Sequence, residues 1–323
     1  MRRILTILLG LCLPVLTACQ SSQTEKPVVI STIKPIQALV YAIAGGADSP
    51  LELRQLLPDG ASPHHYALKP SDSRALEQAS LIFRIDSGLE VFLDKALAGL
   101  PPTTNIVTLT SAPGIRALPL RSPHQHDEDS HDAASEDKHA NEHEAATEAS
   151  SQDLHIWLNP RNAIAMSHTI TQALSQIDPA HTATYQTNAK QLIQSIEATD
   201  AHIRQQLQPL RDQAYLSFHD AWQHFDHHYG LTFAGAVTLD PARQPGAKHV
   251  QAIRQIIQQK QAVCLFQEPQ FPPALIQTLV EGSSIKVGEL DPLGMAIPLD
   301  QKTYIHLLTN AADTFVQCLA SRN

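Results

Sequence analysis

Short apolar runs rich in β-branched residues alternate with longer segments of helical periodicity along most of the chain. The runs cover residues 28–30, 51–57, 81–83 and 105–109 in the first half, and residues 215–218, 231–233, 262–266 and 285–290 in the second. Helix-length segments separate them, for example residues 223–229, 247–259 and 301–319. Such an alternation indicates βαβ units and parallel sheets. We therefore predict an α/β fold of two lobes, each a central, mostly parallel four-stranded sheet flanked by helices.

A long segment without Gly or Pro separates the two sets of runs. Asp178 and Pro179 place an N-cap residue before proline at the first helical position, and apolar residues such as Tyr185, Leu192 and Ile203 then follow a helical period. We predict a rigid linker helix at residues 179–208 that joins an N-terminal lobe, residues 28–178, to a C-terminal lobe, residues 209–323. The alternative is an ordinary surface helix of one lobe.

The first residues have the pattern of an export signal. Arg2 and Arg3 precede an apolar stretch at residues 4–16, which suits a secretory signal and is too short to span a bilayer. Small residues then lead to Cys19, which resembles a bacterial lipobox cysteine. We expect residues 1–18 to be removed as a signal peptide, Cys19 to receive lipid and residues 19–27 to form a polar tether. Cleavage nearby without lipid is the alternative.

The overall composition excludes several classes of protein. The 323 residues are 43% hydrophobic, which is enough for two compact domains, so a small disulfide scaffold is excluded. The formal net charge of −9 leaves no basic footprint for nucleic acid, and we expect no nucleic-acid partner. The 17 histidines stand out beside three methionines and two tryptophans. Because imidazole is the commonest metal ligand in proteins, metal binding becomes the leading hypothesis.

Only two cysteines, Cys264 and Cys318, lie beyond the predicted signal region. Two thiols in an exported domain indicate one disulfide, although two buried free thiols are the alternative.

Residues 123–152 differ abruptly from the rest of the chain. They hold nine Asp or Glu, a single Lys and five histidines, His124, His126, His131, His139 and His143, with almost no bulky apolar residue. This composition cannot bury enough surface to offset chain entropy, so we predict a disordered, acidic, His-rich loop. The loop is a candidate accessory metal site that collects divalent cations weakly. A charged insertion without specific use is the alternative.

Four candidate ligands stand at the ends of predicted strands or at helix starts. His64 and Asp291 each follow a strand-like run, His219 stands where a strand meets a helix, and His155 comes just before a helix start. In open α/β sheets, ligands bind outside the carboxyl ends of the strands. We therefore predict that these four side chains converge in the crevice between the lobes, two from each lobe.

Five further residues are weaker candidates for metal binding or for contact with a metal ligand. His65 is an alternative to its neighbour His64, and Glu268 is a candidate hydrogen-bond partner of a ligand histidine. His224, His227 and His228 lie on one predicted helix, where we favour a solvated face over an accessory metal patch.

Five segments carry a resemblance to a known family. They are Leu-Pro-Asp-Gly-Ala-Ser-Pro-His (57–64), Asp-Leu-His-Ile-Trp-Leu-Asn-Pro (153–160), Phe-His-Asp-Ala (218–221), Gln-Glu-Pro-Gln-Phe (267–271) and Leu-Asp-Pro-Leu-Gly (290–294). Together they are highly specific, whereas singly none is. Along essentially its whole mature length, the chain resembles the metal-binding receptors of ABC transporters for zinc and manganese.

The resemblance implies metal ligation by His64, His155 and His219, with Asp291 near the fourth position. It also implies that Cys264 pairs with Cys318, and an acidic, His-rich insertion is typical of the zinc members. Those members often carry Glu just before the first histidine, where this chain has Pro63. This departure favours Asp291 or a water as the fourth ligand.

The ligand types favour zinc independently of the resemblance. Three neutral imidazoles with one carboxylate or water suit tetrahedral Zn²⁺, whereas Mn²⁺ prefers more oxygen ligands. A carboxylate at position 219 would have favoured manganese.

We therefore expect an exported receptor of the periplasm or cell envelope, not an enzyme, that captures Zn(II) between its lobes and delivers it to an inner-membrane ABC permease. We expect a monomer that contacts the membrane only through an N-terminal lipid. A manganese or other divalent-metal receptor of the same family and a metal-storage or adhesin lipoprotein are alternatives. A zinc hydrolase is disfavoured because the sequence lacks a His-Glu-x-x-His motif.

Overall fold

A computed structural model describes residues 26–121, 152–238, 241, 245–259 and 261–320 of the chain. Several predictions fall outside this range and stay predictions. They are the signal peptide, lipidation of Cys19 and metal collection by the loop histidines His124, His126, His131, His139 and His143.

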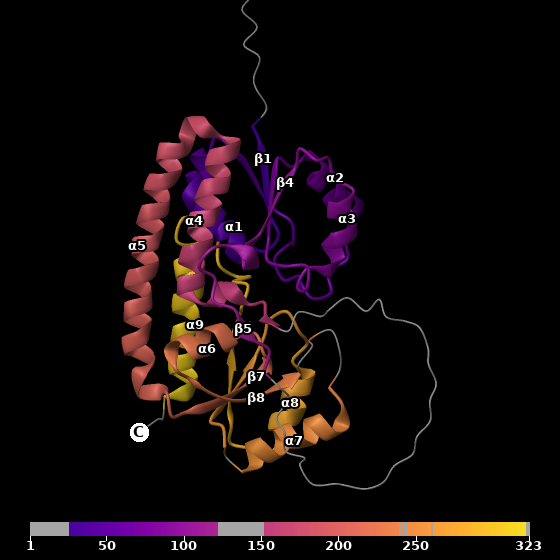
Figure 1. The fold of residues 1–323 in the computed structure, drawn as a ribbon. Helices are drawn as coiled ribbons and strands as arrows, with labels where there is room; N and C mark the ends of the chain where they lie inside the picture. The colour runs from indigo at the N-terminus through magenta and orange to yellow at the C-terminus, as the bar shows by residue number, and fades with distance from the viewer. Residues whose placement is uncertain (1–25, 122–151, 239–240, 242–244, 260, 321–323) are drawn as a thin grey trace, which may run out of the picture.

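Two parallel four-stranded sheets form the centres of two lobes (Figure 1). The first contains β1 (Val28–Ser31), β2 (Glu52–Gln55), β3 (Leu81–Arg84) and β4 (Asn105–Thr108), in the order β2-β1-β3-β4. The second contains β7 (Ala214–His219), β8 (Thr232–Thr238), β9 (Cys264–Gln267) and β10 (Lys286–Glu289), in the order β10-β9-β7-β8. The predicted fold class is confirmed, and the two sheets share one strand order when each is numbered along its own segment of chain.

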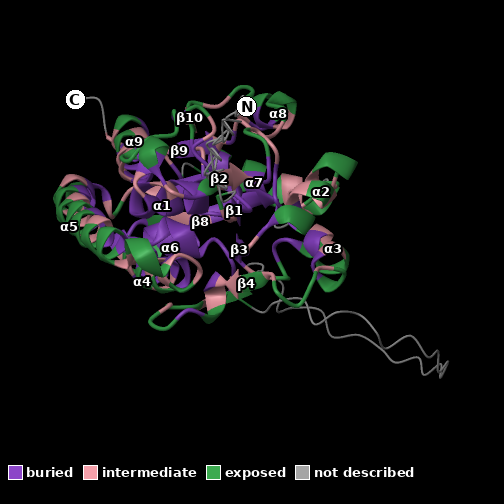
Figure 2. Cartoon of the chain, turned by 90° about the horizontal axis from the view of Figure 1, so that it is seen from above, coloured by how far each residue is buried: buried purple, intermediate pink, exposed green. Residues whose placement is uncertain are grey.

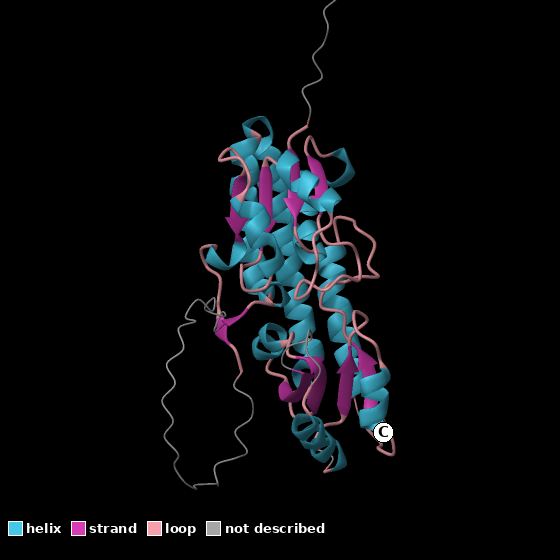
Figure 3. Ribbon diagram, turned by 90° about the vertical axis from the view of Figure 1, so that its right-hand side faces the viewer, coloured by secondary structure: helices cyan, strands magenta, loops and turns pink. Residues whose placement is uncertain are grey.

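Helices cover both faces of each sheet (Figures 1 and 3). In the N-terminal lobe, α1 (Lys34–Ala44) and α4 (Pro160–Ile177) lie on one face, and α2 (Pro70–Gln78) and α3 (Asp94–Ala98) on the other. In the C-terminal lobe, α6 (Gln223–Tyr229) and α9 (Thr303–Leu319) lie opposite α7 (Ala247–Gln258) and α8 (Ala274–Val280). The start of α4 is the one expected from sequence, because the Asn159 side chain caps it by accepting a hydrogen bond from the Arg161 backbone N–H.

The long helix α5 (Thr182–Leu207) runs the length of the molecule and packs against α1, α4 and α9 (Figure 1). Short 3₁₀ turns at Pro179–His181 and Gln208–Leu210 extend it at both ends. Its buried side chains form the predicted apolar stripe, with Tyr185, Leu192 and Ile203 among them. The helix is therefore the stiff connection between the lobes that the sequence predicts, and not a surface helix of one lobe.

The hydrophobic core is continuous between the lobes. One cluster of buried side chains includes Phe83 in the N-terminal sheet, Ile196 on α5 and Phe315 on α9 in the C-terminal lobe. A second cluster lies under the other face of the C-terminal sheet and includes Leu216 and Ile253. Figure 2 shows the buried residues gathered around the strands, with exposed residues on the outer face of α5. Because apolar side chains join the two lobes, we expect little free hinge motion between them.

A two-stranded antiparallel ribbon, which the sequence did not predict, joins the ends of the acidic loop. It pairs β5 (Leu118–Pro119) with β6 (Gln152–Asp153), so Gln152 belongs to a strand and not to the loop as expected. Just after β5, Arg121 forms ion pairs with Asp220 and Asp226 of the C-terminal lobe. The ribbon is thereby fastened to the C-terminal lobe.

Within the described part of the chain, none of the helices combines the length and apolar character needed to cross a membrane.

Candidate metal centre

Three histidines from different elements converge between the lobes. His64 lies in the loop after β2, His155 lies two residues after the end of β6, and His219 is the last residue of β7. The ring centroids of these residues lie 5.2–5.4 Å apart in all three pairs. Each of the three histidines offers one potential ligand nitrogen, and these nitrogens all lie within 4.8 Å of one another. The structure thus brings together three of the four side chains that the sequence singled out.

The facing atoms are the Nε2 nitrogens. Nε2 of His155 lies 3.3 Å from Nε2 of His64 and 3.3 Å from Nε2 of His219. Two nitrogens bound to one tetrahedral Zn²⁺ at 2.0–2.1 Å would be about 3.3 Å apart. The spacing of the imidazoles therefore fits a tetrahedral dication held by His64, His155 and His219.

Buried carboxylates fix the tautomer of two of the rings. Nδ1–H of His155 donates to Asp153 Oδ1 at 2.7 Å, and Nδ1–H of His219 donates to Glu268 Oε1 at 2.5 Å. A neutral imidazole that donates from Nδ1 carries its lone pair on Nε2. Two Nε2 lone pairs that face each other cannot form a hydrogen bond, but both can bind a cation. The expected role of Glu268 as partner of a ligand histidine agrees with this geometry.

The pKa values of His64 and His219 are shifted in opposite directions. Burial and the neighbouring rings of His155 and His219 hold the pKa of His64 well below its usual value, so this ring is neutral. Burial also acts to lower the pKa of His219, but the Glu268 carboxylate outweighs it and raises the pKa above the usual value. A proton therefore competes with a metal ion more strongly at His219 than at His64.

The pKa of Asp153 is also shifted. Burial acts to raise it, but the charge and hydrogen bonds of His155 outweigh burial and lower the pKa below its usual value. Asp153 is thus ionised and provides negative charge directly behind a candidate ligand. Sequence reasoning missed this residue, although its position two residues before His155 in the Asp-Leu-His segment was a usable signal.

Asp291 does not join the cluster as we had expected. Its Oδ1 accepts hydrogen bonds from the backbone N–H groups of Leu293 and Gly294 and from Gln270 Nε2, and its Oδ2 accepts one from the Met295 backbone N–H. A carboxylate with its oxygens occupied in this way organises the loop that follows β10. The structure therefore does not support Asp291 as a ligand.

The weaker histidine candidates lie elsewhere. His65 is exposed, and its ring lies 6.1 Å from that of Phe271, outside the cluster. On α6, His224 is fully buried with Nε2 donating to the Asp153 carbonyl oxygen, while His228 bonds to Asp200. The solvated face that we favoured is confirmed for His227, which is exposed, but it is wrong for His224, which α6 turns into the core.

Apolar side chains enclose the three imidazoles. The small cavity at the cluster is lined by Pro63, Trp157, Phe271 and Leu293 among others. Phe271 stacks on Phe218, and the Trp157 indole N–H donates to the Pro292 carbonyl oxygen. Low polarity around the rings strengthens any bond from their lone pairs to a cation.

The cluster stands at a topological switch point. In the C-terminal sheet, the chain leaves β7 toward β8 on one side and later returns to place β9 on the other side. His219 ends β7 and Glu268 directly follows β9, so this pair flanks the point where the strand order reverses. Open α/β sheets bind ligands at this position, which explains why a histidine and a carboxylate meet there.

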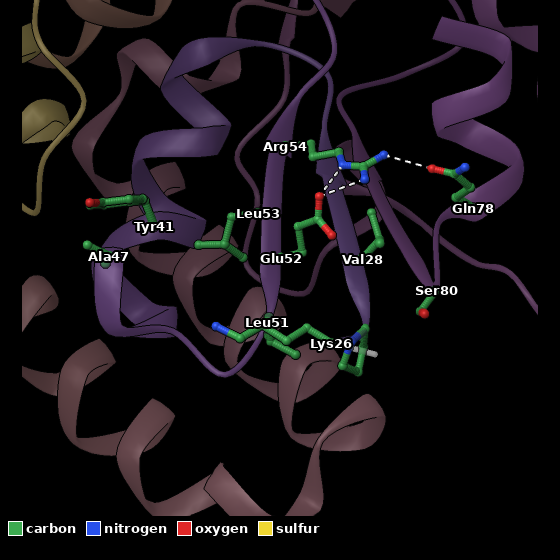
Figure 4. Close-up of a pocket in the computed structure, with 12 residues that line it drawn as sticks. Lys26, Val28, Tyr41, Ala47, Leu51, Glu52, Leu53, Arg54, Gln78 and Ser80 are labelled. Atoms are coloured by element: carbon green, nitrogen blue, oxygen red, sulfur yellow. Dashed lines mark hydrogen bonds and ion pairs between the residues drawn. The ribbon is translucent and has the colours of Figure 1, made fainter. Parts of the chain in front are cut away.

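A wider hollow of about 1030 Å³ lies elsewhere, beside the amino ends of β1 and β2 (Figure 4). Figure 4 shows Arg54 reaching both Glu52 and Gln78 in its wall, so the charged groups there satisfy one another. Because parallel sheets bind ligands at the carboxyl ends of their strands, the hollow is not the functional centre.

Comparison with known proteins identifies the family. Residues 29–318 match the family described as zinc-uptake complex component A, periplasmic. The chain belongs to this family. Proteins named high-affinity zinc uptake system protein ZnuA are similar to it, at 34% identity over 320 residues in Brucella suis, covering 94% of this chain and 95% of the relative. The Yersinia pestis protein of the same name is 34% identical over 298 residues, covering 90% of this chain and 91% of the relative.

The fold of this chain is similar to that of a solved structure. A crystal structure of ZnuA superposes with a TM-score of 0.74 at 21% identity, covering 92% of this chain and all of the solved one. At this identity the likeness concerns the fold.

Proposed function

We propose that this chain is an extracytoplasmic receptor that binds Zn²⁺ through His64, His155 and His219 and delivers it to an ABC permease for import. The observation that carries the proposal is the convergence of three Nε2 atoms, two of them on rings whose Nδ1–H groups donate to carboxylates. Membership of a zinc-uptake family supports the same role.

The ligand set favours zinc over manganese. Three imidazoles at tetrahedral spacing suit Zn²⁺, whereas Mn²⁺ prefers oxygen ligands and higher coordination. The nearest carboxylates, Asp153 and Glu268, accept hydrogen bonds from ligand rings. They supply two negative charges behind the ligand rings, on the side away from the ion, which balances the charge of a buried dication.

Binding and release, and not catalysis, fit this arrangement. A zinc hydrolase needs a carboxylate or imidazole that is free to move a proton beside the metal-bound water. Here Asp153 and Glu268 each accept a hydrogen bond from a candidate ligand, which fits an orienting role.

The partners follow from this role. One chain provides all three imidazoles, so a monomer is sufficient to hold the ion. We propose a periplasmic or cell-envelope location, with the N-terminal lipid on Cys19 as the sole membrane contact and an inner-membrane permease as the recipient of zinc.

Zinc titration of single histidine variants tests the proposal. We expect the wild-type chain to bind one Zn²⁺ tightly, and His64→Ala, His155→Ala and His219→Ala each to weaken it about a thousandfold, because losing a ligand costs more than the 10–100-fold that follows loss of an outer partner. His65→Ala is the matched control and should bind as wild type does. Competition with a chromophoric chelator measures the affinities, and tight binding by all three variants refutes the site.

Deletion of residues 123–151, which keeps β6 intact, tests the storage alternative in the same assay. A receptor retains its single tight site after the deletion, whereas a storage protein loses nearly all of its capacity.

A further inference from the structure

Gln270 lies in the wall of the cavity that holds the three imidazoles. It belongs to the loop between β9 and α8, two residues beyond Glu268. Its Nε2 donates a hydrogen bond to Asp291 Oδ1 at 2.7 Å. Its Oε1 is buried and has no hydrogen-bond partner among the described residues. Leaving a buried amide oxygen without a donor destabilises the fold, so a missing donor is expected beside it.

The orientation of the Gln270 amide is set by its partner. Asp291 Oδ1 already accepts the backbone N–H groups of Leu293 and Gly294, and a carboxylate oxygen that gathers N–H donors requires the NH₂ group of Gln270 on that side. The carbonyl oxygen is therefore the end that Asp291 leaves unpaired.

Two of the three imidazoles do not provide the missing donor. His155 and His219 each use their Nδ1–H for a carboxylate, so the nitrogens that they present to the cluster carry lone pairs. A water bound to Zn²⁺ is a strong donor, because the ion polarises its O–H bonds. Such a water would complete the tetrahedron that three imidazoles leave open.

We propose that Gln270 Oε1 accepts a hydrogen bond from the water that fills the fourth position of the bound zinc, and that Asp291 orients this amide. The inference rests on the proposed function, since it assigns the remaining position of the same site. It also gives the side chain that the sequence placed near the fourth position a different role, because Asp291 acts through Gln270 and not on the ion.

The arrangement has a consequence for the charge of the site. Three imidazoles and a water are all neutral, so the bound ion keeps its full double charge among its direct ligands. Pro63 stands beside His64, where the zinc members often have glutamate, and cannot add an anion. Among the described residues, Asp153 and Glu268 provide compensating charge from behind two of the rings, and not as direct ligands of the ion.

Gln270→Met and Gln270→Glu in the full chain test the proposal, with Gln267→Met as the matched control. Gln267 lies in the same segment but bonds to Glu289 and is outside the cavity lining. We expect Gln270→Met to bind one Zn²⁺ about tenfold more weakly, because it removes the acceptor and keeps the length of the side chain. Gln267→Met should be unchanged, and Gln270→Glu, which keeps an acceptor, should bind at least as tightly as wild type.

A spectroscopic titration separates this role from simple support of the fold. With Co²⁺ in place of zinc, ionisation of the bound water changes the absorption spectrum as the pH rises. An anion beside the water disfavours its ionisation, so Gln270→Glu should move the midpoint to higher pH than in wild type. The proposal is overturned if Gln270→Met binds within twofold of Gln267→Met, or if the Gln270→Glu midpoint does not move. Lack of one tight zinc in the wild-type chain itself contradicts the proposed function instead.

Discussion

The two lobes share a strand order, yet their switch points hold different groups. In the C-terminal lobe, His219 ends β7 and Glu268 follows β9, and the two side chains form a hydrogen bond. In the N-terminal lobe, Ser31 ends the corresponding strand β1, and the buried Glu90 accepts hydrogen bonds from the Ile85 and Asp86 backbone N–H groups just after β3. Each lobe therefore has a buried glutamate that follows the strand beside its switch point.

The hydrogen-bond partner of each glutamate decides whether it can orient a metal ligand. Glu268 has an imidazole beside it and thereby orients a candidate metal ligand. Glu90 lacks one, and burial raises its pKa to about 7, so it holds a proton in mildly acidic solution. One topology thus creates two equivalent positions, and the histidine at the end of β7 makes one of them part of the imidazole cluster.

The largest expected effect concerns the disulfide, which only the C-terminal lobe has. Cys264 on β9 pairs with Cys318 on α9 across 54 residues, as predicted, and residues 28–178 contain no cysteine. We expect the Cys264→Ala, Cys318→Ala double variant to lose about 4 kcal/mol of unfolding free energy, because a long loop is no longer closed in the unfolded chain. Denaturant unfolding with and without reductant measures it.

Two controls sharpen the disulfide comparison. The double variant should not respond to reductant, and its zinc affinity should stay close to wild type because neither cysteine belongs to the imidazole cluster. An equal response of both proteins to reductant would contradict the assignment.

The second prediction uses Glu90 in the N-terminal crevice. A carboxyl group with a raised pKa binds its proton more tightly in the folded than in the unfolded chain. Its contribution to stability is complete below about pH 4.5 and is lost as the pH rises to about 7. Glu90→Gln cannot lose a proton, so between pH 4 and pH 8 the variant should gain about 3 kcal/mol of unfolding free energy relative to wild type.

Thermal or denaturant unfolding across this pH range measures the difference. Glu77→Gln, an exposed glutamate on α2, is the matched control and should show no such trend. Parallel pH profiles for Glu90→Gln and wild type would show that burial does not govern this group.

The smallest expected effect compares the two carboxylates behind the imidazoles. Asp153→Asn and Glu268→Gln should each weaken zinc binding about tenfold, because an amide no longer offers the imidazole an anionic acceptor. The exposed Glu289→Gln on β10 should bind as wild type does. Calorimetric or competition titrations provide the affinities, and an unchanged affinity in both variants would limit the carboxylates to a role in folding.

Local features of the sequence determined much of this protein. Apolar runs and helical periods located all eight strands of the two sheets and the long helix α5, because spacing and capping act within a few residues of each other. The placement of His64, His155 and His219 beside strand ends also located the cluster, because the carboxyl edge of a parallel sheet is a topological property.

Only the tertiary structure decided which polar groups meet around that cluster. Asp291 was expected on the ion, but it bonds to Gln270 and to its own loop, and α6 turns His224 inward. Hydrogen-bond partners depend on side-chain directions in segments that are separate in the chain, as Gln270 and Asp291 are. The sequence does show that Asp153 lies two residues before His155, but it carries no information about the contact of Gln270 with Asp291, which only the folded C-terminal lobe brings together.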